Sequence, residues 1–344
     1  MSPDDAHLGR RVALAGLLHD VGKFAQRAEV DPERYRALEN LHLFCVCVTD
    51  GKGATRYHHA AYTWQFISEH LNWLTRIGEG DETIAGWAAR HHQPSSPIDW
   101  IVAEADRLSA GMDRGHRDES RAGWAQVRQV RLEPIAARIL NLGQGEGAPR
   151  ERTYEFPLTE LEFSGAIFGE PVRQRAQRDA ADEYRALFHG FVQRVKQLPQ
   201  GDLDQFFVGC LSVYEQFAWC VPAATNSAPH DVSFFEHSRA ASAVAAALAY
   251  EMIAANSLDE RSARDRKAKH YALMVGDLSG IQKFIYTITS AKAARALRGR
   301  SLALQLLSDA IAHTFVAELG LRHPVYRPGC AVTPSACGVT EVRA

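Results

Sequence analysis

The sequence predicts a mainly α-helical protein whose N-terminal third forms a compact helical domain. Apolar residues recur every three or four positions across residues 8–112, the spacing that places them on one face of a helix. Glycine- and proline-bearing breaks separate these stretches at residues 51–53, 78–80 and 94–97. A composition of 46% hydrophobic and 23% charged residues is typical of a folded globular chain rather than a disordered one.

Four stretches define the expected helices of this N-terminal domain. They read RVALAGLLHDVGKFAQ (11–26), YTWQFISEHLNWL (62–74), ETIAGWAARHH (82–92) and PIDWIVAEADRLSAG (97–111). From residue 113 the chain turns polar, and LGQGEGAPRER (142–152) is the clearest linker. Helical spacing returns in residues 178–198 and 203–221, and an alanine-rich helix is expected over 237–256.

The spacing of apolar residues changes near residue 270. HYALMVGDLSG (270–280) is typical of a short buried strand that enters a turn, and residues 281–288 and 301–319 are helical again. A strand, a loop and a helix in this order predict the start of an α/β unit. Between residues 261 and 300 there are ten Lys or Arg against two acidic residues, so this segment could meet phosphate or form a solvated basic face.

The bulk numbers exclude several classes of protein. A net charge of −2 argues against a uniformly basic nucleic-acid binder. The six cysteines form no C-x-x-C pair, so they indicate buried thiols rather than a zinc ribbon or a thioredoxin-like site. No apolar run reaches the roughly 18 to 20 residues of a membrane span, and MSPDDAHLGRR at the start does not resemble a signal peptide. These features favour a cytoplasmic protein with no membrane partner.

Histidine and aspartate residues recur at the expected helices of the N-terminal domain. The pair His19-Asp20 lies in an apolar helix, and further candidates follow at His58-His59, His91-His92 and Asp106. Imidazole nitrogen and carboxylate oxygen suit Mn, Ni, Fe or Zn, and two such ions about 3.5 to 4 Å apart can hydrolyse a phosphodiester. Asp20 could bridge two ions, and Lys23, one turn further on, could meet a substrate phosphate. Taken one at a time, His58, His59, His91 and His92 are each more often surface or satisfied core histidines than metal ligands.

The order of these motifs resembles the HD phosphohydrolase superfamily. The segments LLHDVGK, HHAAYT, HHQ, EADRLSAGMDR, DVSFFEHSRAASAVAAAL, GDLSGIQKFIY and ARALRGRSLALQLL are more narrowly similar to the large subunit of type III-A CRISPR effector complexes, from about residue 8 to about 320. The resemblance implies an HD nuclease that cuts single-stranded DNA with divalent metal. It also implies two cyclase-like Palm domains, which in that family make cyclic oligoadenylates from ATP when guide-bound target RNA switches both activities on.

Carried over by position, the resemblance assigns roles to particular residues. It implies metal ligands at His19, Asp20, His59, His91 or His92, and Asp106; with Lys23, which is proposed from its charge, His19 and Asp20 form the expected catalytic set. It matches Asp277, Ser279 and Gly280 to a strand-to-helix loop of the first Palm domain, where backbone amides at a helix start suit a triphosphate and the charges of Lys283, Arg295, Arg298 and Arg300 would add phosphate contacts. A plain turn that caps a helix is the alternative for Ser279-Gly280.

We therefore expect three regions: an HD nuclease domain (1–115), a helical connecting region (116–265) and an incomplete ferredoxin-like Palm domain (266–344). No Gly-Gly-Asp-Asp occurs in the sequence, so loss of cyclic oligoadenylate synthesis is expected, with ATP binding by the Palm fragment left open. The expected cofactors are two divalent ions of Mn, Ni or Mg. The expected partners are single-stranded DNA, the small and backbone subunits of the effector and, indirectly, guide and target RNA. The alternatives are a free-standing HD nucleotide phosphohydrolase and a catalytically silent scaffold subunit.

Overall fold

The protein is described by a computed structural model that divides into two compact units, residues 1–266 and 267–344. The described residues are 3–28, 41–44, 46–47, 55–79, 82–110, 129–135, 154–162, 169–172, 180–225, 230–271, 278–287 and 293–318. They are mainly helical, as the sequence predicts. None of the helices within these ranges is long and apolar enough to cross a membrane.

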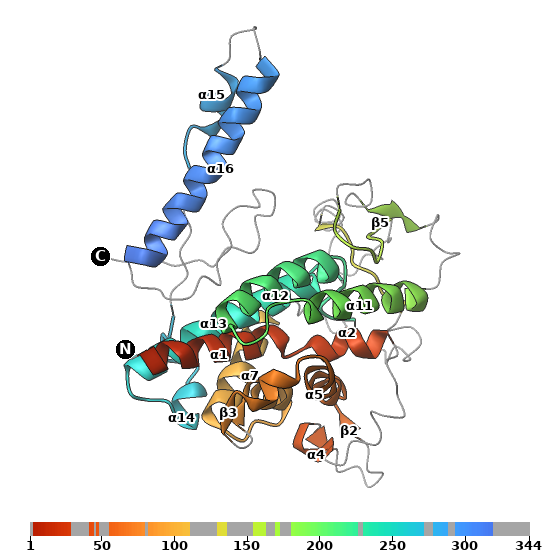
Figure 1. Ribbon diagram of the computed structural model, residues 1–344, viewed down its shortest axis with the longest axis vertical. Coiled ribbons are helices and arrows are strands. Elements are labelled where there is room, and N and C mark those ends of the chain that lie inside the picture. Colours follow the sequence, from red (N-terminus) through yellow and green to blue (C-terminus); the bar gives the residue numbers. More distant parts are fainter. Residues whose placement is uncertain are drawn as a thin grey trace, which may run out of the picture. The chain divides into compact units, whose positions relative to one another are not determined.

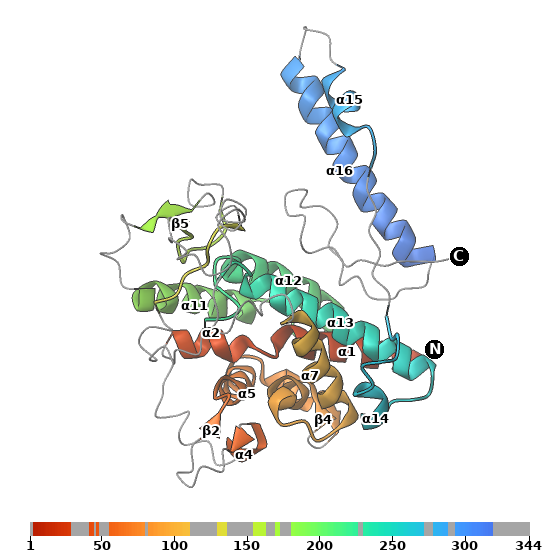
Figure 2. The same cartoon turned by 180° about the vertical axis from the view of Figure 1, so that it is seen from behind.

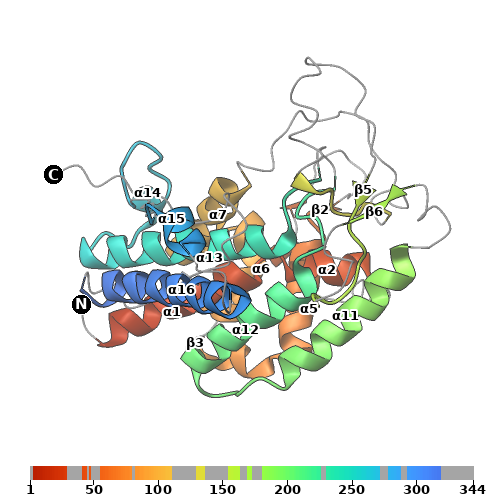
Figure 3. The same ribbon diagram turned by 90° about the horizontal axis from the view of Figure 1, so that it is seen from above.

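Two long helices and their neighbours build the core of the first unit. α1 (Pro3–Leu18) and α2 (Val21–Arg27) run through its middle, with α11 (Ala180–Lys196) and α12 (Leu203–Ala218) on one side and α5 (His59–His70) and α7 (Pro97–Ser109) on the other (Figures 1 and 2). α13 (Phe234–Ala254) packs along α1, as Figure 3 also shows. The predicted connecting region therefore shares one core with the predicted HD helices.

Small residues allow α1 and α13 to approach closely. A Cβ atom on Gly16 would lie 3.0 Å from the Cβ of Ala245 and 3.1 Å from the carbonyl oxygen of Ala241. The hydroxyl of Ser242 donates a hydrogen bond of 2.6 Å to the carbonyl of Ala13, so the two helices are joined by a polar contact as well as by packing. This contact fixes the register of α13 against α1, the helix that ends directly before His19.

Gly22 sets the equally close approach of α2 and α5. A Cβ atom there would lie 1.9 Å from the carbonyl oxygen of His59 and 2.5 Å from the backbone nitrogen of Thr63. Thr63 joins the elements further: its hydroxyl donates to the carbonyl of His19 and accepts from the Gly22 amide. Only glycine lets the two backbones meet in this way, and the meeting brings His59 beside the turn that carries Asp20.

The turn between α6 (Ile84–Ala89) and α7 is held by a buried ion pair. η2 (Arg90–His92), a single 3₁₀ turn, follows α6, and Arg90 donates to the fully buried carboxylate of Asp99 at 2.9 Å. Asp99 also accepts from the backbone of Ser95 and Ser96, and the Ser96 hydroxyl caps α7 in a capping box. The end of α6 and the start of α7 are thereby locked together.

Aromatic side chains fill the interface between α11, α12 and the rest of the unit. Phe191 packs edge to face on Tyr214, with ring centroids 5.2 Å apart, and Phe188 packs on Phe24 of α2 at 5.1 Å. The α12 helix begins at Asp202, whose carboxylate accepts hydrogen bonds from the amides of Asp204 and Gln205. Both helices match the two stretches predicted from spacing.

Short elements complete the described part of the first unit. Three antiparallel pairs of two-residue strands join β1 (Val46–Cys47) to β2 (Thr55–Arg56), β3 (Gly78–Glu79) to β4 (Glu82–Thr83), and β5 (Tyr154–Glu155) to β6 (Glu170–Pro171). α4 (Leu41–Phe44), η1 (Asn72–Arg76) and α14 (Glu260–Ala263) are single helical turns. The break predicted at residues 78–80 is thus the start of a hairpin, where Gly78 adopts a φ of 134°.

The second unit is described over two helices. α15 (Ile281–Tyr286) follows the left-handed Gly280, and α16 (Ala293–Glu318) is the longest helix described. Both helices were predicted from spacing. The predicted strand before Gly280 and the tail after residue 318 lie outside the described residues, so the Palm domain stays a prediction.

Candidate metal centre

The helix predicted over 11–26 is interrupted at His19 and Asp20, and the turn between α1 and α2 brings both side chains into the core. Both side chains are buried, at 0% and 1% exposure, and the ring of His19 is oriented by a 2.7 Å contact from Nδ1 to the carbonyl of Gly16. This contact leaves Nε2 directed at carboxylates. A buried aspartate without a cation is costly, so the groups around Asp20 decide what the turn can do.

One cluster combines two histidines and two aspartates from the turn after α1 and from the helices α7 and α13. The Nε2 atom of His19 lies 3.3 Å from Oδ2 of Asp20 and 3.3 Å from Oδ1 of Asp106. The Nε2 atom of His237 lies 3.2 Å from Asp20 Oδ2 and 3.3 Å from Asp106 Oδ1. All four donor atoms lie within 4.8 Å of one another, which suits a single metal ion.

A second cluster shares Asp20 and adds three histidines. The Nε2 atoms of His59 and His91 lie 3.3 Å and 3.6 Å from Asp20 Oδ1, and His92 Nε2 lies 2.8 Å from His59 Nε2. These four donors also lie within 4.8 Å of one another. The two oxygens of Asp20 therefore face different clusters, the arrangement expected of a carboxylate that bridges two ions.

The donor geometry fits divalent metal. Nitrogen and oxygen ligands about 2.0 to 2.2 Å from an ion lie about 3 to 3.5 Å from one another, close to the separations found here. Two buried donors, Asp20 Oδ1 and His91 Nε2, have no hydrogen-bond partner among the described residues, although buried polar atoms rarely lack one. A cation between them would satisfy both.

Contacts behind the clusters fix the histidine rings. The Nδ1 atom of His91 lies 2.7 Å from the carbonyl of Ala88, and Nδ1 of His237 lies 3.0 Å from the hydroxyl of Ser109. With the contact from His19 to Gly16, three rings from three elements are held through Nδ1 so that Nε2 faces the centre. Metal-binding histidines in proteins are oriented in the same way.

The histidines of the two clusters differ in charge because the acidic groups raise the pKa of some of them above that of the others. Burial alone would lower the pKa of His19, but the charges and hydrogen bonds of Asp20 and Asp106 outweigh it and raise that pKa to about 10. The same competition, with burial opposed by hydrogen bonds to Asp106 and Asp20, raises the pKa of His237. At His91 burial dominates, and with repulsion from His19 it lowers the pKa to about 4. Protons and metal ions would thus compete for His19 and His237, while His91 is neutral and ready to coordinate.

The structure places the sequence-predicted residues of the first unit in the two clusters. His19, Asp20, His59, His91, His92 and Asp106 all belong to one cluster or to both. The second cluster holds both His91 and His92, so which of the two is a ligand stays a prediction. Neither cluster, as found among the described residues, includes His58.

His237 is the member that the sequence prediction missed. It comes from α13, lies 218 residues after His19, and is 2% exposed. Its segment was predicted as the start of an alanine-rich helix and also carries part of the family resemblance, but neither observation gave His237 a role. The available signal was one histidine on the alanine-rich face of a predicted helix, which by itself is typical of an ordinary core residue.

Lys23 lies beside the shared aspartate. Its Nζ contacts Oδ2 of Asp20, and its side chain is 26% exposed. Burial would lower the pKa of Lys23, but the negative charges of Asp20 and Asp106 raise it. The lysine is therefore a permanent cation that lies on Asp20 and reaches solvent, as a phosphate contact requires.

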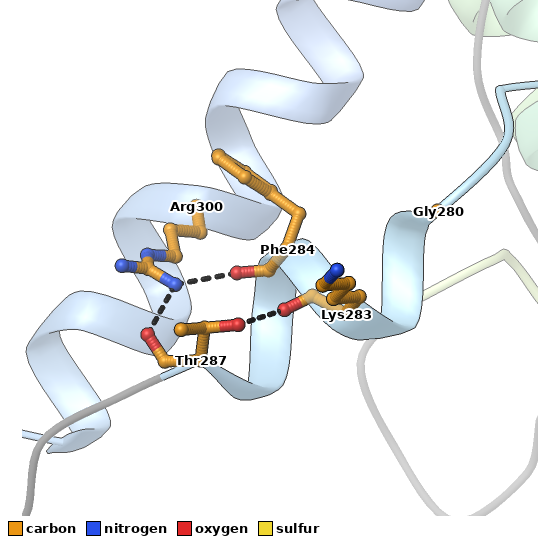
Figure 4. A pocket seen from close by; sticks show the side chains of 5 residues that line it. All are labelled: Gly280, Lys283, Phe284, Thr287 and Arg300. Atoms are coloured by element: carbon orange, nitrogen blue, oxygen red, sulfur yellow. Dashed lines mark hydrogen bonds between the residues drawn. The ribbon is translucent and has the colours of Figure 1, made fainter.

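The second unit shows only part of the predicted nucleotide loop. Ser279, Gly280 and Lys283 are exposed around the start of α15, and Asp277 lies outside the described residues. Arg300 donates to the carbonyls of Phe284 and Thr287 and so joins α16 to α15, and Gly280, Lys283, Phe284, Thr287 and Arg300 line a shallow pocket (Figure 4). Arg295 and Arg298 are exposed on α16. Their predicted roles toward ATP or phosphate remain predictions.

Comparison with known families defines the class of the first unit. Residues 6–111 match the HD domain family, and the helices that carry His19, Asp20, His59, His91, His92 and Asp106 lie within this range. Residues 270–326 match the family described as Csm1 subunit domain B. The chain therefore joins an N-terminal HD domain to a Csm1-type segment.

Curated proteins similar to this chain narrow the family. The chain is similar to the CRISPR system single-strand-specific deoxyribonuclease Cas10/Csm1 (subtype III-A) of Methanocaldococcus jannaschii, with 26% identity over 90% of this chain and 38% of the relative. The proteins of the same description from Mycobacterium tuberculosis and Thermococcus onnurineus are 27% identical, over 89% and 90% of this chain and 37% and 36% of those proteins. The chain is a partial-length homologue of the type III-A Cas10/Csm1 proteins and spans less than two-fifths of the length of these three.

Solved structures show the same fold. A crystal structure of a Csm1-Csm4 cassette in complex with cA4 superposes with a TM-score of 0.55 at 22% identity, over 91% of this chain and 36% of the other. A Csm1-Csm4 subcomplex of the type III-A CRISPR-Csm interference complex gives a TM-score of 0.53 at 22% identity, with the same coverage. At this identity the likeness concerns the fold alone.

Proposed function

We propose that the first unit is a metal-dependent HD nuclease that hydrolyses single-stranded DNA. The observation that carries this proposal is Asp20, whose two carboxylate oxygens face two separate histidine-rich clusters. A pair of adjacent cation sites is the usual arrangement for phosphodiester hydrolysis. The substrate follows from the relatives, which are described as single-strand-specific deoxyribonucleases.

The proposed ligands divide between two ions. His19, His237 and Asp106 would hold one ion, His59, His91 and His92 would hold the other, and Asp20 would bridge them. When bound, a pair of divalent ions supplies Lewis-acid stabilisation of the phosphoryl charge and makes water nucleophilic at neutral pH. Mn, Ni and Mg are the candidates, and the predominance of imidazole favours Mn or Ni over Mg.

The remaining residues position and shield the reaction. Lys23 is the proposed contact to a phosphate oxygen, because it is a partly exposed cation directly beside Asp20. The hydrogen bonds to Gly16, Ala88 and Ser109 keep three imidazoles in a coordinating orientation throughout turnover. Burial of His19, His91 and His237 excludes bulk water from the inner side of the clusters.

We place this nuclease in a type III-A CRISPR effector complex. The solved relatives pair Csm1 with Csm4, which supports a partner of that kind for this chain. Contacts with the backbone and small subunits, and indirectly with guide and target RNA, belong to the same proposal, as does a cytoplasmic setting. Gly-Gly-Asp-Asp does not occur in these 344 residues, and cyclic oligoadenylate synthesis is not part of the proposal for them.

Cleavage of labelled DNA tests the proposed activity. We expect the chain with Mn or Ni to cut a single strand, and the His19→Ala/Asp20→Ala double variant to be inactive because both clusters lose ligands. The His189→Ala variant, which changes an exposed histidine of α11, is the control and should cut normally. Equal cutting by the wild type and the double variant would assign the activity elsewhere. Hydrolysis of nucleotides without cutting of DNA would favour a free-standing phosphohydrolase.

A further inference from the structure

Tyr57 lies at the exposed edge of the second cluster. Its ring stacks on the imidazole of His92, with centroids 3.9 Å apart and planes at 28°, and meets His59 edge to face at 6.1 Å. The residue is 47% exposed, although its ring contacts a histidine of the proposed metal site. An aromatic ring that touches the centre and also reaches solvent is well placed to meet a substrate.

The backbone at Tyr57 is held in a conformation that tyrosine rarely adopts. Its φ of 63° lies in the left-handed region, which favours glycine and asparagine. The carbonyl of Tyr57 accepts a hydrogen bond from the amide of Ala60 in the first turn of α5, so the strained residue is fixed to the helix that begins at His59. Strain of this kind collects at functional sites, and here it keeps a large ring in a place that asparagine would occupy more easily.

We propose that Tyr57 is a stacking platform for a base of the single-stranded substrate, and that it positions the adjoining phosphodiester at the clusters. The inference rests on the proposed nuclease function and deepens it by naming a substrate-binding residue. Every base has a flat π-face, so stacking on tyrosine binds single strands with little dependence on sequence. The ring of Tyr57 would lie between the base and His92, a proposed metal ligand.

The same ring would select against duplex DNA. Bases within a duplex already stack on their neighbours and would have to leave the helix to reach Tyr57, which costs free energy. A single strand offers its bases without that cost. Tyr57 would therefore contribute to single-strand preference without any hydrogen bond to a base edge.

The Tyr57→Asn variant separates a substrate role from a structural one. Asparagine accepts the left-handed backbone, so we expect the unfolding temperature and the bound metal to be unchanged. We expect the KM for single-stranded DNA to rise about tenfold or more, with a small change in kcat, because one stacked base is lost. Tyr57→Phe keeps the ring and should behave as wild type, and Tyr154→Asn, which changes a tyrosine of equal 47% exposure in β5, is the matched control.

Binding without turnover keeps the test independent of the nuclease proposal. With a chelator present, the Kd for labelled oligonucleotides that carry one abasic nucleotide at successive positions is measured by fluorescence anisotropy. The wild type should lose affinity at one position, and Tyr57→Asn should bind weakly and be insensitive to that position. Loss of metal from Tyr57→Asn, or the same KM and Kd as wild type, would overturn the inference. Failure of the wild type to cut DNA would count against the nuclease alone, since the Kd comparison would still report on the ring.

Discussion

Asp20 derives its proposed role from having two buried oxygens that face different imidazoles. Oδ2 lies 3.2 Å from His237 Nε2 and Oδ1 lies 3.3 Å from His59 Nε2. Burial would raise the pKa of Asp20, but the nearby charges of Lys23 and His19 keep it well below its usual value, so the carboxylate is ionised and able to bind cations. Without metal, protons on His19 and His237 and the ammonium group of Lys23 balance this charge.

The raised pKa of His19 predicts how the metal-free protein responds to pH. Its pKa is about 10 in the folded chain against an ordinary value of 6.5, and the pKa of His237 is raised as well. A pKa raised by folding contributes stability that is complete below 6.5 and is lost as pH approaches 10. The lowered pKa of His91, about 4, acts only below 6.5 and does not oppose this trend.

We therefore expect the free energy of unfolding of chelator-treated protein to fall between about pH 6.5 and pH 7.5, about one unit below the ordinary pKa of cysteine. Urea unfolding followed by circular dichroism measures it. The His19→Gln/His237→Gln variant should lose most of the slope, because the two titrating rings are gone. A stability that is flat or rises over this interval in the unaltered chain would contradict the assigned charge states.

At the scale of elements, the spacing of apolar residues predicted the helices. It did not predict the contacts that orient the metal-binding side chains. The helix over 97–111 follows from its apolar period, and Pro97 after Ser96 marks its start. The 3₁₀ turn that carries His91 and His92 depends on the buried pair of Arg90 and Asp99, which forms only once α6 and α7 have met. The spacing of apolar residues within one helix cannot predict an ion pair between two elements.

Gly22 provides a direct test of how the elements position His59. In Gly22→Ala the new methyl group would clash with the backbone of α5 at His59 and Thr63, and backbone cannot move aside as a side chain can. We expect a loss of about 2 kcal/mol or more in the free energy of unfolding, well beyond the usual gain of alanine over glycine in a helix. Metal affinity of the second cluster should fall too, because His59 would move from Asp20.

Gly209→Ala is the matched control for this substitution. Gly209 is also helical and in the first unit, but its added methyl group would meet the flexible end of the Leu198 side chain at 2.7 Å. Denaturant unfolding and metal titration of both variants complete the comparison. If Gly22→Ala were as stable as Gly209→Ala and bound metal normally, the close approach of α2 and α5 would not be what sets the site.

At the scale of the whole molecule, the structure packs together two regions that were expected to be separate. The expectation of an HD domain that ends near residue 115 treated α13 as part of a separate connecting region. The structure packs α13 on α1 and assigns residues 1–266 to one unit, so His237 reaches the clusters. Pairing between distant helices depends on the fit of small residues such as Gly16 and Ala245, which periodicity within either segment cannot reveal.

The amount of metal bound per chain tests the central claim most directly. After equilibrium dialysis against a Mn concentration that just saturates the wild type, elemental analysis should find two ions in the wild type, one in His237→Ala, one in His92→Ala and none in Asp20→Ala, while His189→Ala keeps two. This pattern follows only if one carboxylate joins two sites and α13 supplies a ligand to the first. One ion in the wild type, or two ions retained by His237→Ala, would contradict the shared centre.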